Sequence, residues 1–251
     1  MAAPITPQPA PIAVPPPIVT GATSALPRLI VAGVALLGGL LLIALAIPRL
    51  GAALELARAK PVYDRLQSHD ASIDDATLEM AIDALRKGFE RSSEPQLGSM
   101  LASLYKAQAD RTADAALATR RYAQAAEAAR ATLRISPSNL TAWVLLAASL
   151  DALNPQDPAV VAALTRAIRV GPYDPRLRDL RIMLAMRHWR RLDPETRALA
   201  AFLIKRAAQL DLRALAVQAR EYLGLPAVHE SLQDDPALRA RFNTMYQSLP
   251  R

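Results

Sequence analysis

The sequence predicts an all-α protein: one N-terminal transmembrane helix followed by a helical domain. Three observations predict this class. A single uncharged apolar run, from Leu29 to Ile47, is longer than any other in the chain. The remainder consists of stretches with apolar residues three and four positions apart, separated by short turns. No alternating apolar–polar run, which would be typical of a strand, occurs in the 251 residues.

Residues 1–27 precede the apolar run and form a proline-rich tail. They contain eight prolines and no charged side chain. Because proline fixes φ and has no backbone donor, the tail is predicted to be disordered, with local polyproline II character. A proline-rich docking motif is the alternative interpretation. The absence of a basic flank favours a flexible lead-in instead.

Residues 28–49 are predicted to be the transmembrane helix, which anchors the chain in a lipid bilayer. Its apolar part, Leu29 to Ile47, lies between Arg28 and Arg49. At 1.5 Å per residue this part spans about 28 Å, close to the hydrocarbon thickness of a bilayer. A cleaved signal peptide is the alternative, since residues 44–46 read Ala-Leu-Ala. The long lead-in and the length of the run favour an uncleaved anchor.

The charges beside the anchor bear on its orientation. The N-terminal side offers Arg28 and the α-amino group, and the C-terminal side offers Arg49, Arg58, Lys60 and Arg65. The positive-inside rule therefore favours, by a small margin, a cytoplasmic location for the helical domain.

The chain after the anchor divides at Pro61 and at further turns. Residues 50–74 are predicted to be a juxtamembrane helix and linker, with the helix running from Gly51 to Lys60 and ending at Pro61. Residues 75–251 form the helical domain, whose first helices open at Asp74-Asp75 and at Pro95. The later helices are predicted over residues 120–135, 138–153, 158–170, 176–191, 194–209 and 211–223.

Two passages of the helical domain are related by a fixed offset. Pro137 closes one helix, and Pro172 closes another thirty-five positions later. A period near 34 residues with paired helices is typical of a helical solenoid. The passages resemble the tetratricopeptide repeat at Tyr122, Ala125, Pro137, Trp143, Leu146, Ala147, Leu150, Leu164, Ala167 and Pro172.

The match to this repeat covers about 55 residues and is degenerate. Thr132 stands where a small alanine is expected, and Asp151 follows Leu150 without the usual glycine-bearing turn. The resemblance implies a tetratricopeptide-like solenoid of antiparallel helix pairs over residues 75–251, which would act by protein–protein interaction.

A second resemblance covers more of the chain. The run Gly171-Pro172-Tyr173-Asp174-Pro175, together with later positions, is similar to a group of bacterial membrane-anchored accessory factors of exopolysaccharide (Vps-type) biosynthesis. The later positions are Leu177, Leu180, Arg181, Leu184, Trp189, Leu192, Pro194, Glu195 and Arg197. This resemblance implies a scaffold at the bacterial inner (cytoplasmic) membrane, spanning it once. Its partners would be membrane or envelope proteins of polysaccharide synthesis or export.

Residues able to carry chemistry are few. Cysteine is absent, which excludes disulfides, thiolate metal sites and a thiol nucleophile. His69, His188 and His229 lack a metal-ligand spacing, and a surface position is favoured for His188. The acidic residues before Pro194 and Pro236 are interpreted as helix caps, with Leu238 and Phe242 on one face of the last helix. The sequence therefore predicts no catalytic, cofactor or metal site and no enzyme.

Two sets of candidate binding residues remain. A partner groove is expected near Trp143, Tyr173, Arg181 and Trp189, although helical spacing alone does not separate groove from core. Residues 176–220 carry eleven basic and four acidic residues, so the alternative function is binding of a polyanion or of anionic lipid. The candidates for this alternative are Arg176, Arg178, Arg187, Arg190 and Arg191. Scarce aromatics make nucleic acid an unlikely partner.

Overall fold

The computed structural model describes residues 25–68, 73–175 and 177–250, and these residues are all-helical with no strand. By internal contacts the chain divides into two compact units, Met1–Leu45 and Ala46–Arg251. The predicted tail, residues 1–27, falls almost entirely outside the described residues, as does the side chain of Leu29. His69 and Arg176 also lie outside them.

The first unit contains the start of helix α1, whose full extent is Ala25–Gln67. Apolar side chains of α1 are exposed in this region. Val31 and Leu42 are each 69% exposed, and Ile47, just beyond the unit boundary, is 63% exposed. The most apolar window of α1 has a mean hydropathy of 2.1. Among the described residues, α1 is the one helix long and apolar enough to cross a membrane.

The second unit begins with the last turns of α1. The prediction that the juxtamembrane helix ends at Pro61 was wrong, because α1 continues to Gln67. Proline removes one backbone hydrogen bond from a helix. Packing offsets that loss, since Ala59 is fully buried and Val62 and Leu66 pack against the core. The segment predicted as a linker is therefore partly a core element of the folded unit.

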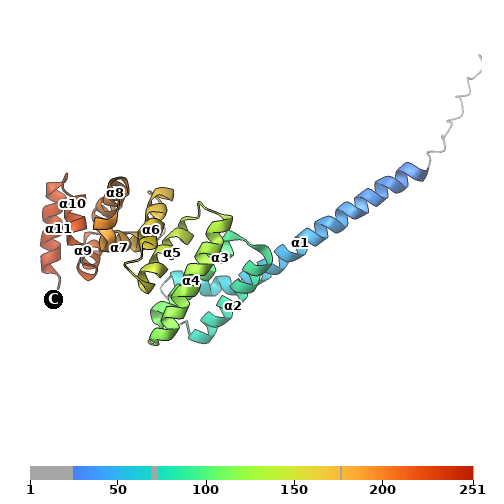
Figure 1. The fold of residues 1–251 in the computed structure, drawn as a ribbon, viewed down its shortest axis with the longest axis horizontal. Helices are drawn as coiled ribbons and strands as arrows, with labels where there is room; N and C mark the ends of the chain where they lie inside the picture. Colours follow the sequence, from blue (N-terminus) through green and yellow to red (C-terminus); the bar gives the residue numbers. More distant parts are fainter. Residues whose placement is uncertain (1–24, 69–72, 176, 251) are drawn as a thin grey trace, which may run out of the picture. The chain divides into compact units, whose positions relative to one another are not determined.

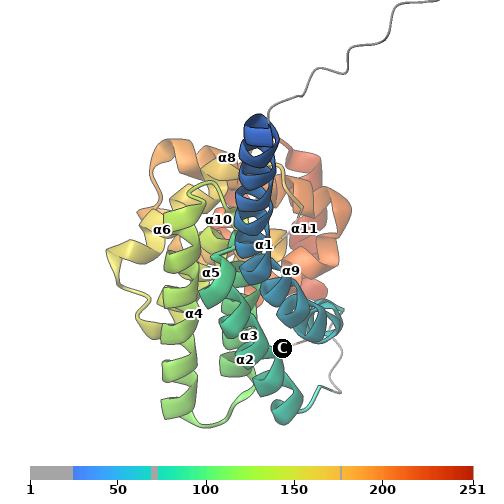
Figure 2. The same ribbon diagram turned by 90° about the vertical axis from the view of Figure 1, so that its right-hand side faces the viewer.

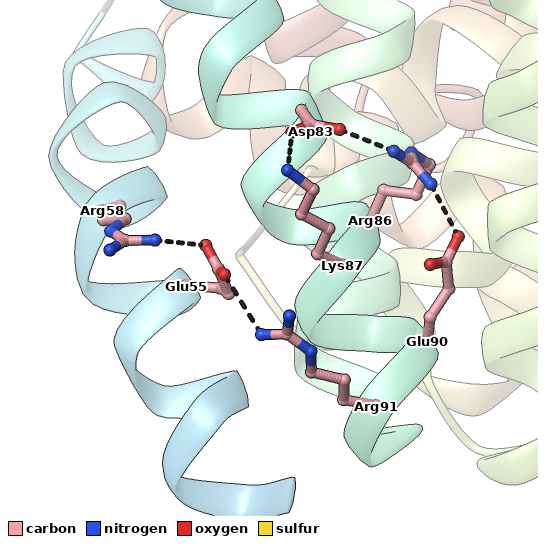
Figure 3. A network of polar contacts seen from close by, with 7 residues as sticks. All are labelled: Glu55, Arg58, Asp83, Arg86, Lys87, Glu90 and Arg91. Carbon is pink, nitrogen blue, oxygen red and sulfur yellow. Dashed lines mark hydrogen bonds and ion pairs between the residues drawn. The ribbon is translucent and has the colours of Figure 1, made fainter.

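One ion pair joins this segment of α1 to α2 (Asp75–Ser92). The buried Glu55 carboxylate accepts from Arg58 Nη1 at 3.1 Å and from Arg91 Nη1 on α2 at 3.2 Å (Figure 3). Gly88 on α2 allows the two helices to approach closely, because a Cβ there would lie 3.3 Å from the Glu55 Cβ on α1. A small residue and a shared carboxylate thus join the two helices.

The remaining helices stack in sequence order within this unit, as Figure 1 shows from α2 to α6, and each of these helices packs on the next. Beyond α6, helices also pack on later neighbours, as α8 does on α10 and α9 does on α11. These elements are α3 (Pro95–Arg111), α4 (Ala115–Ile135), α5 (Leu140–Leu153), α6 (Pro158–Val170), α7 (Arg178–His188), the 3₁₀ turn η1 (Trp189–Arg191), α8 (Pro194–Leu210), α9 (Leu212–Glu221), α10 (Leu225–Ser231) and α11 (Pro236–Ser248).

The caps predicted from the sequence are confirmed. Asp74, Asp193 and Asp235 each accept a backbone N–H of the first turn, at 2.6, 3.0 and 3.0 Å. Leu238 and Phe242 are buried on one face of α11, as expected. Viewed along the stack, α3 lies beside α4 and α2 (Figure 2), in agreement with their contacts.

A glycine opposite Thr132 accounts for one departure from the repeat pattern. Thr132 on α4 is fully buried where a smaller alanine was expected. Gly98 on α3 faces it so closely that an added Cβ would overlap the Thr132 hydroxyl and lie 2.9 Å from the Phe89 ring. The volume that threonine adds to α4 is therefore removed from α3, and the two helices still pack closely.

Candidate functional site

The candidate site is a groove of about 1010 Å³ on the second unit. Its floor is the outer face of α8, and its walls are the α6–α7 connection and α10 with the turn that follows it. Figure 1 shows α8 and α10 as neighbours, and these two helices pack on one another. Its lining side chains include Tyr173, Asp174, Arg178, Ala198, Phe202, Lys205, Arg206, Gln209, Leu210, Glu230 and Asp234.

Two aromatic rings form one end of the groove. Tyr173 on the α6–α7 connection and Phe202 on α8 meet edge to face, with ring centroids 5.2 Å apart. Tyr173 is 73% exposed and Phe202 is 47% exposed. Exposed aromatic side chains that line a concavity are the usual anchors of protein interfaces.

The groove also carries charges of both signs. Lys205 Nζ lies 2.7 Å from the Asp234 carboxylate, and this hydrogen bond lowers the pKa of Asp234 below its ordinary value. Arg178 Nε lies 3.2 Å from the neighbouring Asp179. Arg206, by contrast, makes no ion pair with any residue that the structure describes, and its Nη1 donates only a long bond of 3.4 Å to Gln209.

Arg181 supports the wall that carries Tyr173. Its side chain is fully buried, and its two Nη atoms donate to the backbone carbonyls of Gly171 and Asp174. Burial lowers the pKa of Arg181 below the ordinary value for arginine. The two carbonyls lie on either side of Tyr173 in the sequence. One planar guanidinium therefore holds this part of the α6–α7 connection in place.

Trp189 supports the opposite wall. The ring is buried in the core, and its Nε1 donates to Glu230 Oε2 on α10 at 2.7 Å. Arg197 on α8 lies over the same ring, 5.9 Å from its centroid, and 3.8 Å from Glu230. Trp189 thus contacts α10 through Glu230 and α8 through Arg197.

The structure corrects the predicted groove residues. Of the four candidates, Tyr173 lines this groove, whereas Arg181 and Trp189 are buried in the core. Both side chains are long enough to extend from α7 and η1 into the interior, and helical spacing in the sequence does not reveal this. Trp143 lies elsewhere: it is half-buried on α5, and its Nε1 donates to the Pro137 carbonyl at 2.7 Å. Sequence reasoning missed Phe202 and Arg206, although an aromatic on the polar face of α8 was a readable signal.

The arginines of the basic segment do not gather on one surface. Arg178 lines the groove, and Arg190 is exposed after α7. Arg187 pairs with the buried Asp151 at 2.9 Å. Arg191 donates to the carbonyls of the α5–α6 turn, the closest being Pro155 at 2.6 Å. Two of the predicted polyanion ligands are therefore engaged in tertiary contacts.

The expectation of a surface position for His188 was wrong. His188 is only 4% exposed, and its Nε2 lies 2.7 Å from the Asp151 carboxylate. Arg187 forms an ion pair with the same buried Asp151 carboxylate on α5. The group ties α7 to α5, and a separation of 37 residues gives no sequence signal for such a pairing. Among the residues that the structure describes, no cluster of His, Cys, Asp and Glu has metal-binding geometry.

The fold and the groove define a class: an all-helical protein with one helix able to cross a membrane and a stacked helical unit bearing an aromatic groove. Comparison with known proteins adds no family to this description, because no family model, curated protein or solved structure matches the chain.

Proposed function

We propose that this protein is a single-pass membrane-anchored scaffold whose helical unit binds a partner protein in the groove over α8. The observation that carries the proposal is the exposed Tyr173–Phe202 pair, which lies in a groove whose walls are held by the Arg181 and Trp189 hydrogen bonds. A surface that is apolar, aromatic and concave is what a protein partner uses as an anchor point.

The stacking of helices supports a tetratricopeptide-like solenoid as the architecture. Tyr122 on α4 occupies a repeat position, and its hydroxyl donates to Asp110 on α3 at 2.7 Å. Solenoids bind partners through extended surfaces made by successive helices. In this proposal, α1 crosses the bacterial inner membrane once, and the helical unit lies on the cytoplasmic side.

The pathway is part of the same proposal. The resemblance at Gly171–Pro175 and Trp189 points to an accessory role in exopolysaccharide synthesis or export, with membrane or envelope proteins as partners. The structure gives these residues a common task that supports the proposal. Gly171 and Asp174 accept from Arg181, and Trp189 donates to Glu230. Of the similar positions, Tyr173, Asp174 and Pro175 line the groove.

A pull-down from detergent-solubilised membranes tests the proposal. The tagged wild-type chain is expected to recover a glycosyltransferase or export component, and the double variant Tyr173→Ala/Phe202→Ala is expected to lose it. The control is Met80→Ala/Ile135→Ala, which removes exposed apolar side chains outside the groove. Equal recovery by both double variants, or no envelope protein with the wild type, would overturn the proposal.

A membrane-tethered polyanion- or lipid-binding protein is the second candidate. One observation favours it: Arg178, Lys205 and Arg206, all from residues 176–220, converge on the groove. Binding to acidic glycans or to phosphatidylglycerol vesicles that weakens steeply with salt, and that Arg206→Gln reduces, would support this candidate. If the protein retained neutral phosphatidylcholine vesicles as well as phosphatidylglycerol vesicles, this candidate would be ruled out.

A further inference from the structure

The groove floor presents one row of side chains along α8. Ala198, Phe202, Arg206 and Leu210 are each four positions apart, and all four line the groove. Residues at this spacing lie above one another on a helix, about 6 Å apart. In order along the row stand a small residue, an aromatic ring, a cation and an aliphatic side chain. Phe202 and Leu210 are 47% and 57% exposed, so no described part of the chain covers the row.

The charge of this row is positive, and no residue that the structure describes forms an ion pair with it. Lys205 and Asp234 neutralise one another, as do Arg178 with Asp179 and Glu230 with Arg197. The Asp174 carboxylate, which also lines the groove, interacts with the buried charge of Arg181. Arg206 has no such partner among the described residues and stands between the two exposed apolar side chains. An occupant that covered Phe202 and Leu210 would also desolvate Arg206. Burial of an unpaired cation is costly, so the fitting occupant supplies a carboxylate at that level.

The walls restrict the shape of the occupant. Arg181 holds the α6–α7 connection, and Trp189 holds Glu230 on α10, so the groove exists before anything binds. A preformed site spends little free energy on ordering its own side chains. A helix laid against α8 presents its own rows at the same spacing of about 6 Å, which matches the aromatic, cationic and aliphatic positions in turn.

We propose that the groove receives an acidic amphipathic helix of the partner protein. Its apolar side chains cover Phe202 and Leu210, and an Asp or Glu one turn from each of them pairs with Arg206. This inference rests on the proposed function and names the kind of partner segment that the groove selects.

Photo-cross-linking in intact membranes tests the inference on the full-length chain. A benzophenone amino acid replaces Gln209, which lines the groove beside Arg206, and the cross-linked peptide is sequenced. The matched control carries the same probe at Glu127, which is exposed on α4. The expected product at Gln209 is a partner segment with an acidic residue flanked by apolar residues four positions to either side.

A charge exchange makes the test specific. Arg206→Glu is expected to lower the cross-link yield about tenfold or more, and replacing the mapped acidic residue of the partner by Lys is expected to restore it. The control Arg213→Glu reverses an exposed charge on α9 outside the groove and should leave the yield unchanged.

The unfavourable outcomes distinguish failure of the acidic-helix inference from failure of the scaffold proposal. A mapped segment that is basic or uncharged, or a yield that the charge exchange does not restore, overturns the acidic-helix inference and leaves the scaffold proposal standing. A cross-link to lipid or to a second copy of this chain overturns the inference as well. No protein product at Gln209 above the Glu127 control contradicts both.

Discussion

Trp189 donates from its indole Nε1 to the Glu230 carboxylate at 2.7 Å, and this bond connects the core of the helical unit to one wall of the groove. Trp189, one of the residues near which a groove was expected, is therefore buried behind the groove surface. Trp143, the other tryptophan of the chain, makes the equivalent bond to a carbonyl in the α4–α5 turn at the same distance. The two residues form a matched pair for experiment.

Trp189→Phe removes the bond to Glu230 and keeps most of the apolar ring. We expect a loss of about 1 kcal/mol in the free energy of unfolding, measured by urea denaturation in detergent, and weaker partner recovery. Trp143→Phe should cost a similar free energy and leave partner recovery unchanged. If both variants bound the partner equally well, Trp189 would have no role in positioning the groove.

Arg181→Met should be among the most damaging substitutions in the unit. It leaves the carbonyls of Gly171 and Asp174 without the guanidinium that they share, and we expect a loss of about 3 kcal/mol. Arg181→Lys should rescue little, because an ammonium does not reproduce the planar fork. Urea denaturation measures both. Arg190→Met, at an exposed position, is the control, and equal midpoints for all variants would contradict the assignment.

Gly98→Ala tests the close approach of α3 and α4. On helix propensity alone, alanine would stabilise α3 by about 1 kcal/mol. We expect instead a loss of about 1–3 kcal/mol, because the new methyl group meets the Thr132 hydroxyl and the Phe89 ring. The double variant Gly98→Ala/Thr132→Ala should recover part of this loss. Thermal midpoints of the single and double variants measure the coupling between positions 98 and 132. A midpoint for Gly98→Ala above that of the wild type would contradict the close packing of α3 on α4.

The Asp193 cap predicts a defined pH dependence. Hydrogen bonds from Thr196, aided by the charge of Arg169, lower the pKa of Asp193 from 3.8 to about 2. A carboxylate with a depressed pKa in the folded state stabilises the fold fully above its unfolded pKa, and this contribution is lost as the pH falls towards about 2.

The difference in thermal midpoint between the wild type and Asp193→Asn should therefore be constant at neutral pH and shrink between about pH 4 and about pH 2. Circular dichroism over that range measures it. Asp179→Asn is the control, and a difference that did not change with pH would exclude the cap as its source.

The sequence predicted the all-α class, the long apolar helix and the capped helix starts, because these depend on local patterns of apolar spacing and turn chemistry. It did not predict the continuation of α1 through Pro61, since this depends on the tertiary packing of Ala59 and Val62. Tyr173 lines the groove, whereas the burial of Arg181 and His188 could not be predicted, because their partners come from distant or non-helical segments. Such pairings leave no periodic signal.

The central claim, that the groove over α8 is occupied by a protein partner at the membrane, is tested most directly by cysteine accessibility. The chain contains no cysteine, so Gln209→Cys and Glu127→Cys each introduce a single thiol. Maleimide labelling is compared in permeabilised native membranes and after purification in detergent. The account predicts that the thiol at position 209 is protected in native membranes and reactive after purification, while the thiol at position 127 reacts in both. Equal labelling of the two positions in native membranes would contradict the account.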